Sequence, residues 1–149
     1  MTNLTTLCIS TEKMLKNFSP MPTLKEVRIL AFSQVKNCYS LEEFFKKNTQ
    51  LKKIEFARGL NDKILQIILS YKYLNYLYID GTSHLLLGNE SYVPNYTIKK
   101  LFLGLIICGE RAIKIINACQ NLEILIFESV GSEELGTMRW NELNQRLKF

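Results

Sequence analysis

The sequence contains few of the residues that enzymes and metal sites commonly use. It has one histidine, His84, and no Cys-x-x-Cys pair among its four cysteines, so it offers no zinc ligand set of the usual spacing. The phosphate-binding patterns G-x-x-x-x-G-K-[ST] and G-x-G-x-x-G are also missing. A nucleophile needs a base beside it, and His84 has no partner set nearby in the sequence. We therefore expect no enzyme, and we expect neither a metal nor a cofactor.

Long apolar segments are missing as well. The longest apolar run, Leu101 to Cys108, has eight residues, whereas a membrane-spanning helix needs about 20. The first eight residues carry no basic segment or apolar stretch, so we expect no signal peptide. The four cysteines are then better explained as free thiols in a reducing compartment than as two disulfides. We expect a cytoplasmic or nuclear protein that does not contact membranes.

The net charge of +5 and the isoelectric point near 9.0 raise the question of nucleic acid binding. The 19 lysine and arginine residues are spread from Lys13 to Lys148, however, and no four of them are consecutive. This distribution is typical of a mildly basic, solvated surface. A basic protein associated with nucleic acid remains the alternative, and it would bind with a steep dependence on salt.

Leucine and isoleucine are abundant, with 23 and 15 residues against four alanines. Many of them belong to a pattern L-x-x-L-x-L, in which Ile, Val or Phe also occur. The pattern starts at intervals of 20, 27, 23, 24 and 24 residues, a spacing typical of leucine-rich repeats. It predicts a single repeat domain over residues 1–149. The six copies begin at Leu4, Leu24, Leu51, Leu74, Ile98 and Leu122.

Each copy predicts a strand, because residues two apart point to the same side of a strand. The segments between the copies have room for short helices. Ser40 and Glu43 match a capping box, and Asn61 or Asp62 can cap the next helix. Since no unit can bury its apolar face alone, we expect an α/β fold, a short horseshoe-shaped solenoid of about six strand–helix units. Its parallel strands would line the concave side and its helices the convex side.

Two segments depart from the regular unit. The segment 80–97 contains Gly81, Gly88 and Pro94, which interrupt helices, so we expect an irregular loop there. Residues 132–149 place Trp140, Leu143 and Leu147 on one helical face. We expect this segment to cap the C-terminal end of the solenoid, because terminal repeats need a covered face.

Two short motifs resemble the repeats of F-box/LRR proteins of the cysteine-containing subtype. Leu60-Asn61-Asp62 is similar to the start of the helix in these repeats, and Cys119-Gln-Asn-Leu122 to the step into the next strand. The resemblance implies that the chain recruits substrates for a ubiquitin ligase. Because the first copy starts at Leu4, we expect no F-box in the chain. A fragment of a longer protein, a degenerate paralogue and a free-standing repeat protein all fit the sequence.

The predicted outward positions of the last three strands carry large apolar side chains. A contiguous patch of this kind often marks an interaction site, and we expect it to bind a protein partner on the concave face. The alternatives are the general preference of strands for such residues and a further part of the chain that covers them. The sequence alone sets no oligomeric state. The candidate residues are Tyr76, Tyr78, Phe102, Ile124 and Ile126, with Lys100, Lys53 and Arg28 as a charged rim.

Overall fold

The computed structural model describes residues 3–15, 18–30, 39–57, 60–80, 91–104 and 109–128. In these residues the chain forms an α/β fold with one six-stranded sheet, three α-helices and one short 3₁₀ helix, η1. The predicted α/β class is therefore confirmed. The strands are β1 (Thr6–Ile9), β2 (Glu26–Ile29), β3 (Lys53–Phe56), β4 (Tyr76–Ile79), β5 (Lys100–Leu103) and β6 (Ile124–Phe127). The helices are η1 (Glu12–Leu15), α1 (Tyr39–Lys47), α2 (Asp62–Leu69) and α3 (Gly109–Ala118).

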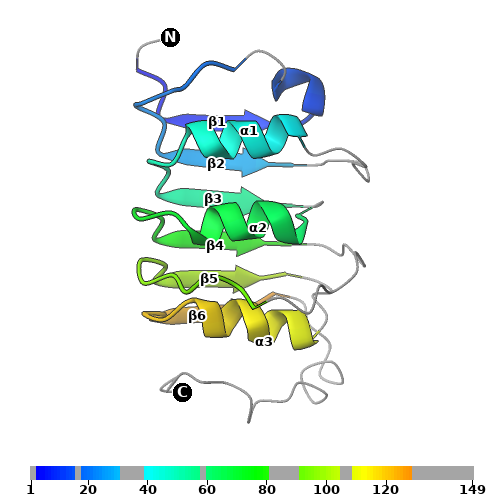
Figure 1. Cartoon of the computed structure of the whole chain (residues 1–149), viewed down its shortest axis with the longest axis vertical. Helices are drawn as coiled ribbons and strands as arrows, with labels where there is room; N and C mark the ends of the chain where they lie inside the picture. The colour runs from blue at the N-terminus through cyan, green and yellow to red at the C-terminus, as the bar shows by residue number, and fades with distance from the viewer. Residues whose placement is uncertain are drawn as a thin grey trace.

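The sheet is parallel throughout, and its strands follow one another in chain order from β1 to β6. Every strand covers the third to sixth residues of one L-x-x-L-x-L copy, as the pattern predicted. The pairing aligns equivalent residues, so that Leu77 lies opposite Leu101 and Ile79 opposite Leu103. The three α-helices all lie over one face of the sheet, and none of the described helices covers the other face, which we call the open face (Figure 1).

The same two backbone hydrogen bonds extend every strand pair beyond the strand ends. Before the strands, for example, the Lys52 N–H donates to the Lys25 carbonyl over 2.7 Å. After the strands, the Ala57 N–H donates to the Ile29 carbonyl over 2.8 Å. Equivalent bonds occur at all five strand pairs, so each unit repeats the backbone geometry of the preceding one.

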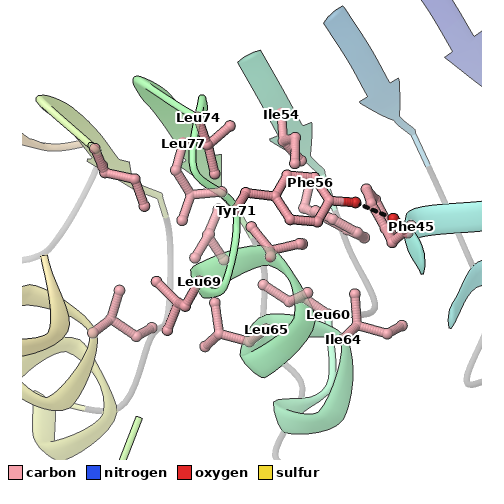
Figure 2. Close-up of a cluster of buried hydrophobic side chains, with 14 of the residues drawn as sticks. Phe45, Ile54, Phe56, Leu60, Ile64, Leu65, Leu69, Tyr71, Leu74 and Leu77 are labelled. Carbon is pink, nitrogen blue, oxygen red and sulfur yellow. Dashed lines mark hydrogen bonds between the residues drawn. The ribbon is translucent and has the colours of Figure 1, made fainter. Parts of the chain in front are cut away.

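The core lies between the sheet and the helices. Strand residues such as Ile54, Phe56 and Leu77 are fully buried, and helix residues complete the layer (Figure 2). The ring centroids of Phe45 on α1 and Phe56 on β3 lie 5.6 Å apart, which joins helix and sheet. The buried apolar residues of the α-helices are Leu41, Phe44, Phe45, Ile64, Leu65, Ile68, Leu69, Ala112, Ile113, Ile115 and Ile116.

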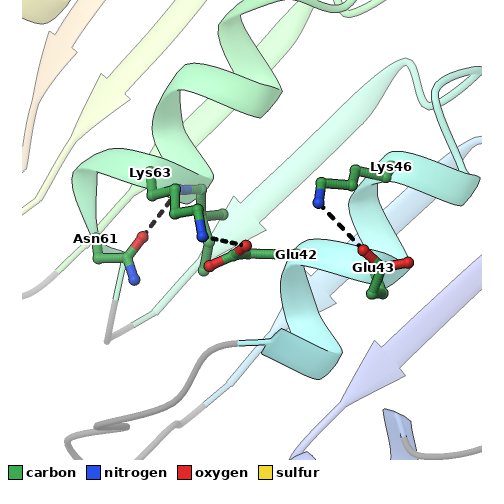
Figure 3. Close-up of polar contacts among 6 residues, drawn as sticks. Glu42, Glu43, Lys46, Asn61 and Lys63 are labelled. Carbon is green, nitrogen blue, oxygen red and sulfur yellow. Dashed lines mark hydrogen bonds and ion pairs between the residues drawn. The ribbon is translucent and has the colours of Figure 1, made fainter.

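The sequence predicted the capping residues of two helices, and the structure confirms one prediction and contradicts the other. Asn61 caps α2, because its side chain accepts a 2.8 Å hydrogen bond from the Ile64 N–H. The prediction for α1 is wrong, since α1 begins at Tyr39 and Ser40 already lies inside it. The Glu43 carboxylate instead pairs with the Lys46 ammonium over 3.1 Å, one turn further along the helix (Figure 3).

A column of buried side chains joins consecutive units where the chain approaches each strand. These residues lie three positions before the first residue of a copy, the position that Cys119 occupies before Leu122. The Asn95 side chain donates to the carbonyls of Leu69 and Tyr71 and accepts from the N–H groups of Thr97 and Ile98, all at 2.8 to 2.9 Å. The column consists of Met21, Asn48, Tyr71, Asn95 and Cys119, of which the last four are buried.

A second column lies two positions further along, directly before the first Leu. Thr97 donates its hydroxyl proton to the carbonyl of Leu74, the first residue of the preceding copy, over 2.7 Å. Because backbone groups away from water need partners, these contacts satisfy carbonyls that the strands leave free. Equivalent bonds run from Thr23 to Leu4 and from Gln50 to Leu24.

Several sequence expectations lie outside the described residues, including the cap at 132–149, His84, Cys38 and Cys108. Of the segment 80–97, residues 80 and 91–97 are described and contain no helix. Cys8 is exposed and Cys119 is buried. None of the helices in the described residues is long and apolar enough to cross a bilayer.

We expect Asn95→Ala to lower the free energy of unfolding by about 2 to 4 kcal/mol, because two carbonyls and two N–H groups lose their buried partner. The exposed Asn75 provides a matched control, and Asn75→Ala should change stability by less than about 0.5 kcal/mol. Urea denaturation of both variants measures the difference. Equal losses in the two would contradict the proposed bridging role of Asn95.

Alkylation should distinguish the two described thiols. Burial raises the pKa of the Cys119 thiol to about 12, and the thiolate is the form that reacts. With iodoacetamide at pH 8 we expect Cys8 to react at least about 100-fold faster than Cys119. Peptide mass spectrometry measures both rates, and in 6 M guanidinium the difference should vanish. A rapid reaction of Cys119 in the native protein would argue against its burial.

Candidate functional site

The open face of the sheet carries the predicted outward residues in regular rows. In β3 and β4 the residues alternate between half-buried outward positions and fully buried inward ones. The register places Tyr78, Phe102 and Ile126 in one row across β4, β5 and β6. Tyr76, Lys100 and Ile124 form the neighbouring row. We call Tyr76, Tyr78, Phe102, Ile124 and Ile126 the aromatic surface.

The rings of the aromatic surface pack against one another. The centroids of Tyr76 and Phe102 lie 4.9 Å apart with an interplanar angle of 31°. Those of Tyr78 and Phe102 lie 6.4 Å apart. Both distances lie within the range at which aromatic rings attract one another. The two isoleucines beside them are more open, with 39% of Ile124 and 38% of Ile126 exposed, so the surface remains accessible over β6.

A charged group borders the aromatic surface on the side of β3. The Lys53 ammonium lies 4.8 Å from the centre of the Tyr76 ring, within range of a cation–π interaction. Its hydrogen bond to Glu55, 2.9 Å long, raises the pKa of Lys53. Arg28 on β2 contacts the other Glu55 oxygen over 3.3 Å. Glu55 thus holds both cations and offsets part of their charge.

A second charged group lies where β4, β5 and β6 end. The Tyr78 hydroxyl donates to the Glu128 carboxylate over 2.9 Å. Burial raises the pKa of Tyr78, and the hydrogen bond to Glu128 and the nearby Asp80 carboxylate raise it further. Asp80 itself leans over Gly104, where even a methyl group would overlap its carboxylate. The aromatic surface therefore has an acidic border at this end.

The structure brings together most of the predicted site residues. Lys53 and Lys100 lie directly beside the aromatic surface, while Arg28 lies one strand further away and reaches it through Glu55. Reasoning from the sequence missed the roles of Glu55, Asp80 and Glu128. Their outward positions were visible in the repeat, but the contacts between strands were not. No group of three or more metal-ligating side chains occurs in the part of the chain that the structure describes.

The tyrosine hydroxyls offer a probe of this geometry. In Glu128→Gln the pKa of Tyr78 should fall, because the variant loses a charged acceptor that favours the protonated hydroxyl. It should still lie above the usual value for tyrosine, since burial is the larger cause. Titration of tyrosine ring carbons by NMR measures this shift. Tyr92, whose pKa burial raises to about 12, should not change, and an unchanged Tyr78 would exclude the contact with Glu128.

The fold and the aromatic surface can be compared with what is known of other proteins. Comparisons with protein-family models, curated proteins and solved structures find no match to this chain. Its function is therefore inferred from its own residues and contacts.

Proposed function

We propose that the chain is a leucine-rich repeat solenoid that binds a protein partner through the open face of its sheet. The solenoid is supported by the six copies of one pattern, each aligned with its neighbours in the same register. It is further supported by the equivalent backbone bonds at all five strand pairs. Repeat proteins of this kind commonly use the exposed sheet as their binding surface.

One observation carries the binding role, namely a contiguous aromatic and aliphatic surface on a face that none of the described helices covers (Figure 1). Contiguous exposed apolar patches often mark interaction sites on soluble proteins. Tyrosine is also enriched among the residues that dominate binding energy, because it combines a large apolar ring with a polar hydroxyl. The preference of strands for aromatic residues explains single positions, but it does not explain why three rings meet on adjacent strands.

The resemblance to F-box/LRR repeats suggests a specific form of this function, the recognition of substrates for a ubiquitin ligase. Nucleic acid binding has less support from the contacts on the open face. Arg28 and Lys53 share the Glu55 carboxylate, and this pairing reduces the positive charge available to phosphates. We therefore favour a protein as the partner.

The test is an affinity purification from cell extract followed by mass spectrometry. The double variant Tyr78→Ala plus Phe102→Ala should lose the partners that the wild-type chain retains. As a matched control, Thr6→Ala plus Cys8→Ala alters two outward residues on β1, which lies three strands away from β4, the strand that carries Tyr78. The control should retain the partners. Circular dichroism and thermal unfolding establish that both variants are folded.

Recovery of the same partners by both variants would exclude the aromatic surface as the binding site. A steep loss of all binding with increasing salt, together with recovery of RNA or DNA, would support the nucleic acid alternative instead.

A further inference from the structure

The acidic border of the aromatic surface is formed by equivalent positions of three neighbouring units. Asp80, Gly104 and Glu128 are the first residues after β4, β5 and β6. The Gly104 N–H donates to the Ile79 carbonyl and the Glu128 N–H to the Leu103 carbonyl, at 2.8 and 2.9 Å. The three residues therefore lie side by side across the sheet, with a glycine between two carboxylates.

Both carboxylates turn toward the middle of this row. Asp80 lies over Gly104, and only the missing side chain of the glycine leaves room for it. Glu128 reaches back from β6 to accept the hydrogen bond from Tyr78 on β4, two strands away. A hydroxyl has a single proton to donate, so Tyr78 cannot satisfy both carboxylates at once. Two like charges thus converge beside the rings of the aromatic surface.

Neither carboxylate has a lysine or arginine partner among the described residues. The seven ion pairs found there use other acids, and Glu55 on the same face holds two cations within 3.3 Å. The chain as a whole carries a net charge of +5. A shortage of cations therefore does not explain why Glu55 has two cationic partners while Asp80 and Glu128 have none among the described residues. An added cation at Asp80 and Glu128 would relieve their repulsion and form charge-assisted hydrogen bonds.

The opposite end of the aromatic surface has the opposite charge. Lys100 begins β5 and Gly104 follows its end, and four residues of extended chain span roughly 13 Å. That separation exceeds the Debye length of about 10 Å at 0.1 M salt, so a bound segment would experience the two ends as distinct. The charge beside the aromatic surface therefore changes sign along the strands. It is positive at their start, at Lys100, and negative at their end, at the two carboxylates.

From this charge pattern we infer the chemistry of the protein partner. The partner presents an arginine or lysine side chain to Asp80 and Glu128, next to an apolar side chain that packs on Tyr78 and Phe102. Arginine fits best, because its planar fork of donors can reach two carboxylates and its flat face can stack on a ring. This inference rests on the proposed function, since it assumes that the aromatic surface binds a protein.

The test is a selection of random 12-residue peptides displayed on phage, with the purified full chain as bait. Peptides selected by the wild-type chain should be enriched in arginine or lysine beside an apolar residue. In Asp80→Asn plus Glu128→Gln, which keeps the shape of both side chains, we expect these peptides to bind about tenfold more weakly. Glu26→Gln plus Glu123→Gln removes the same charge from β2 and from the residue before β6, and it should leave their affinity unchanged.

The outcomes distinguish the inference from the function on which it depends. Selected peptides that need Tyr78 and Phe102 but show no excess of basic residues would overturn the inference and leave the proposed function standing. The same holds if the basic peptides bind the Asp80→Asn plus Glu128→Gln variant equally well. If no selected peptide depends on Tyr78 and Phe102, both fail. Sedimentation that shows self-association through these two residues would instead identify a second copy of the chain as the occupant.

Discussion

The structure depends on one constraint, which is that no unit of about 24 residues can bury its own apolar side chains. Each strand turns two residues inward, for example Leu77 and Ile79, and a helix and the next strand must cover them. Burial of each such side chain contributes about 2 kcal/mol. The units therefore stabilise one another only when they stack in the same register. A slip by one residue would turn every inward side chain to the open face.

The stack also has to provide partners for its backbone in the turns before the strands. In the described residues, side chains provide partners for several of these backbone groups. Asn95 alone forms four hydrogen bonds to backbone groups of its own and the preceding unit, and Tyr71 reaches the carbonyl of Phe45 one unit earlier (Figure 2). These columns hold consecutive units at one spacing. The rows of the open face, and with them the aromatic surface, acquire their geometry from this spacing.

The helices contribute a third set of contacts between units. Lys63 on α2 pairs with Glu42 on α1 over 2.8 Å (Figure 3), and Arg111 on α3 pairs with Asp62 on α2 over 3.0 Å. Glu42 and Arg111 are both largely buried, so each of these pairs lies partly out of water. The helix layer is thereby tied together by charge as well as by apolar packing, whereas the open face keeps two carboxylates without a described cation. This contrast underlies the inference that a basic side chain of the partner binds Asp80 and Glu128.

The sequence by itself determined the positions of all six strands. In each copy of the pattern the last two apolar residues are two positions apart, as in a strand with one buried face, and the copies recur about every 24 residues. It also determined which residues face outward, since alternation along a strand follows from backbone geometry. It failed at Ser40, which lies inside α1 and not at its N-cap. Only the tertiary structure decided that Glu55 joins Arg28 to Lys53, and that Asp80 and Glu128 approach one hydroxyl. The contacts of Arg28 with Glu55 and of Tyr78 with Glu128 join residues 27 and 50 positions apart, so they exist only once the units have stacked.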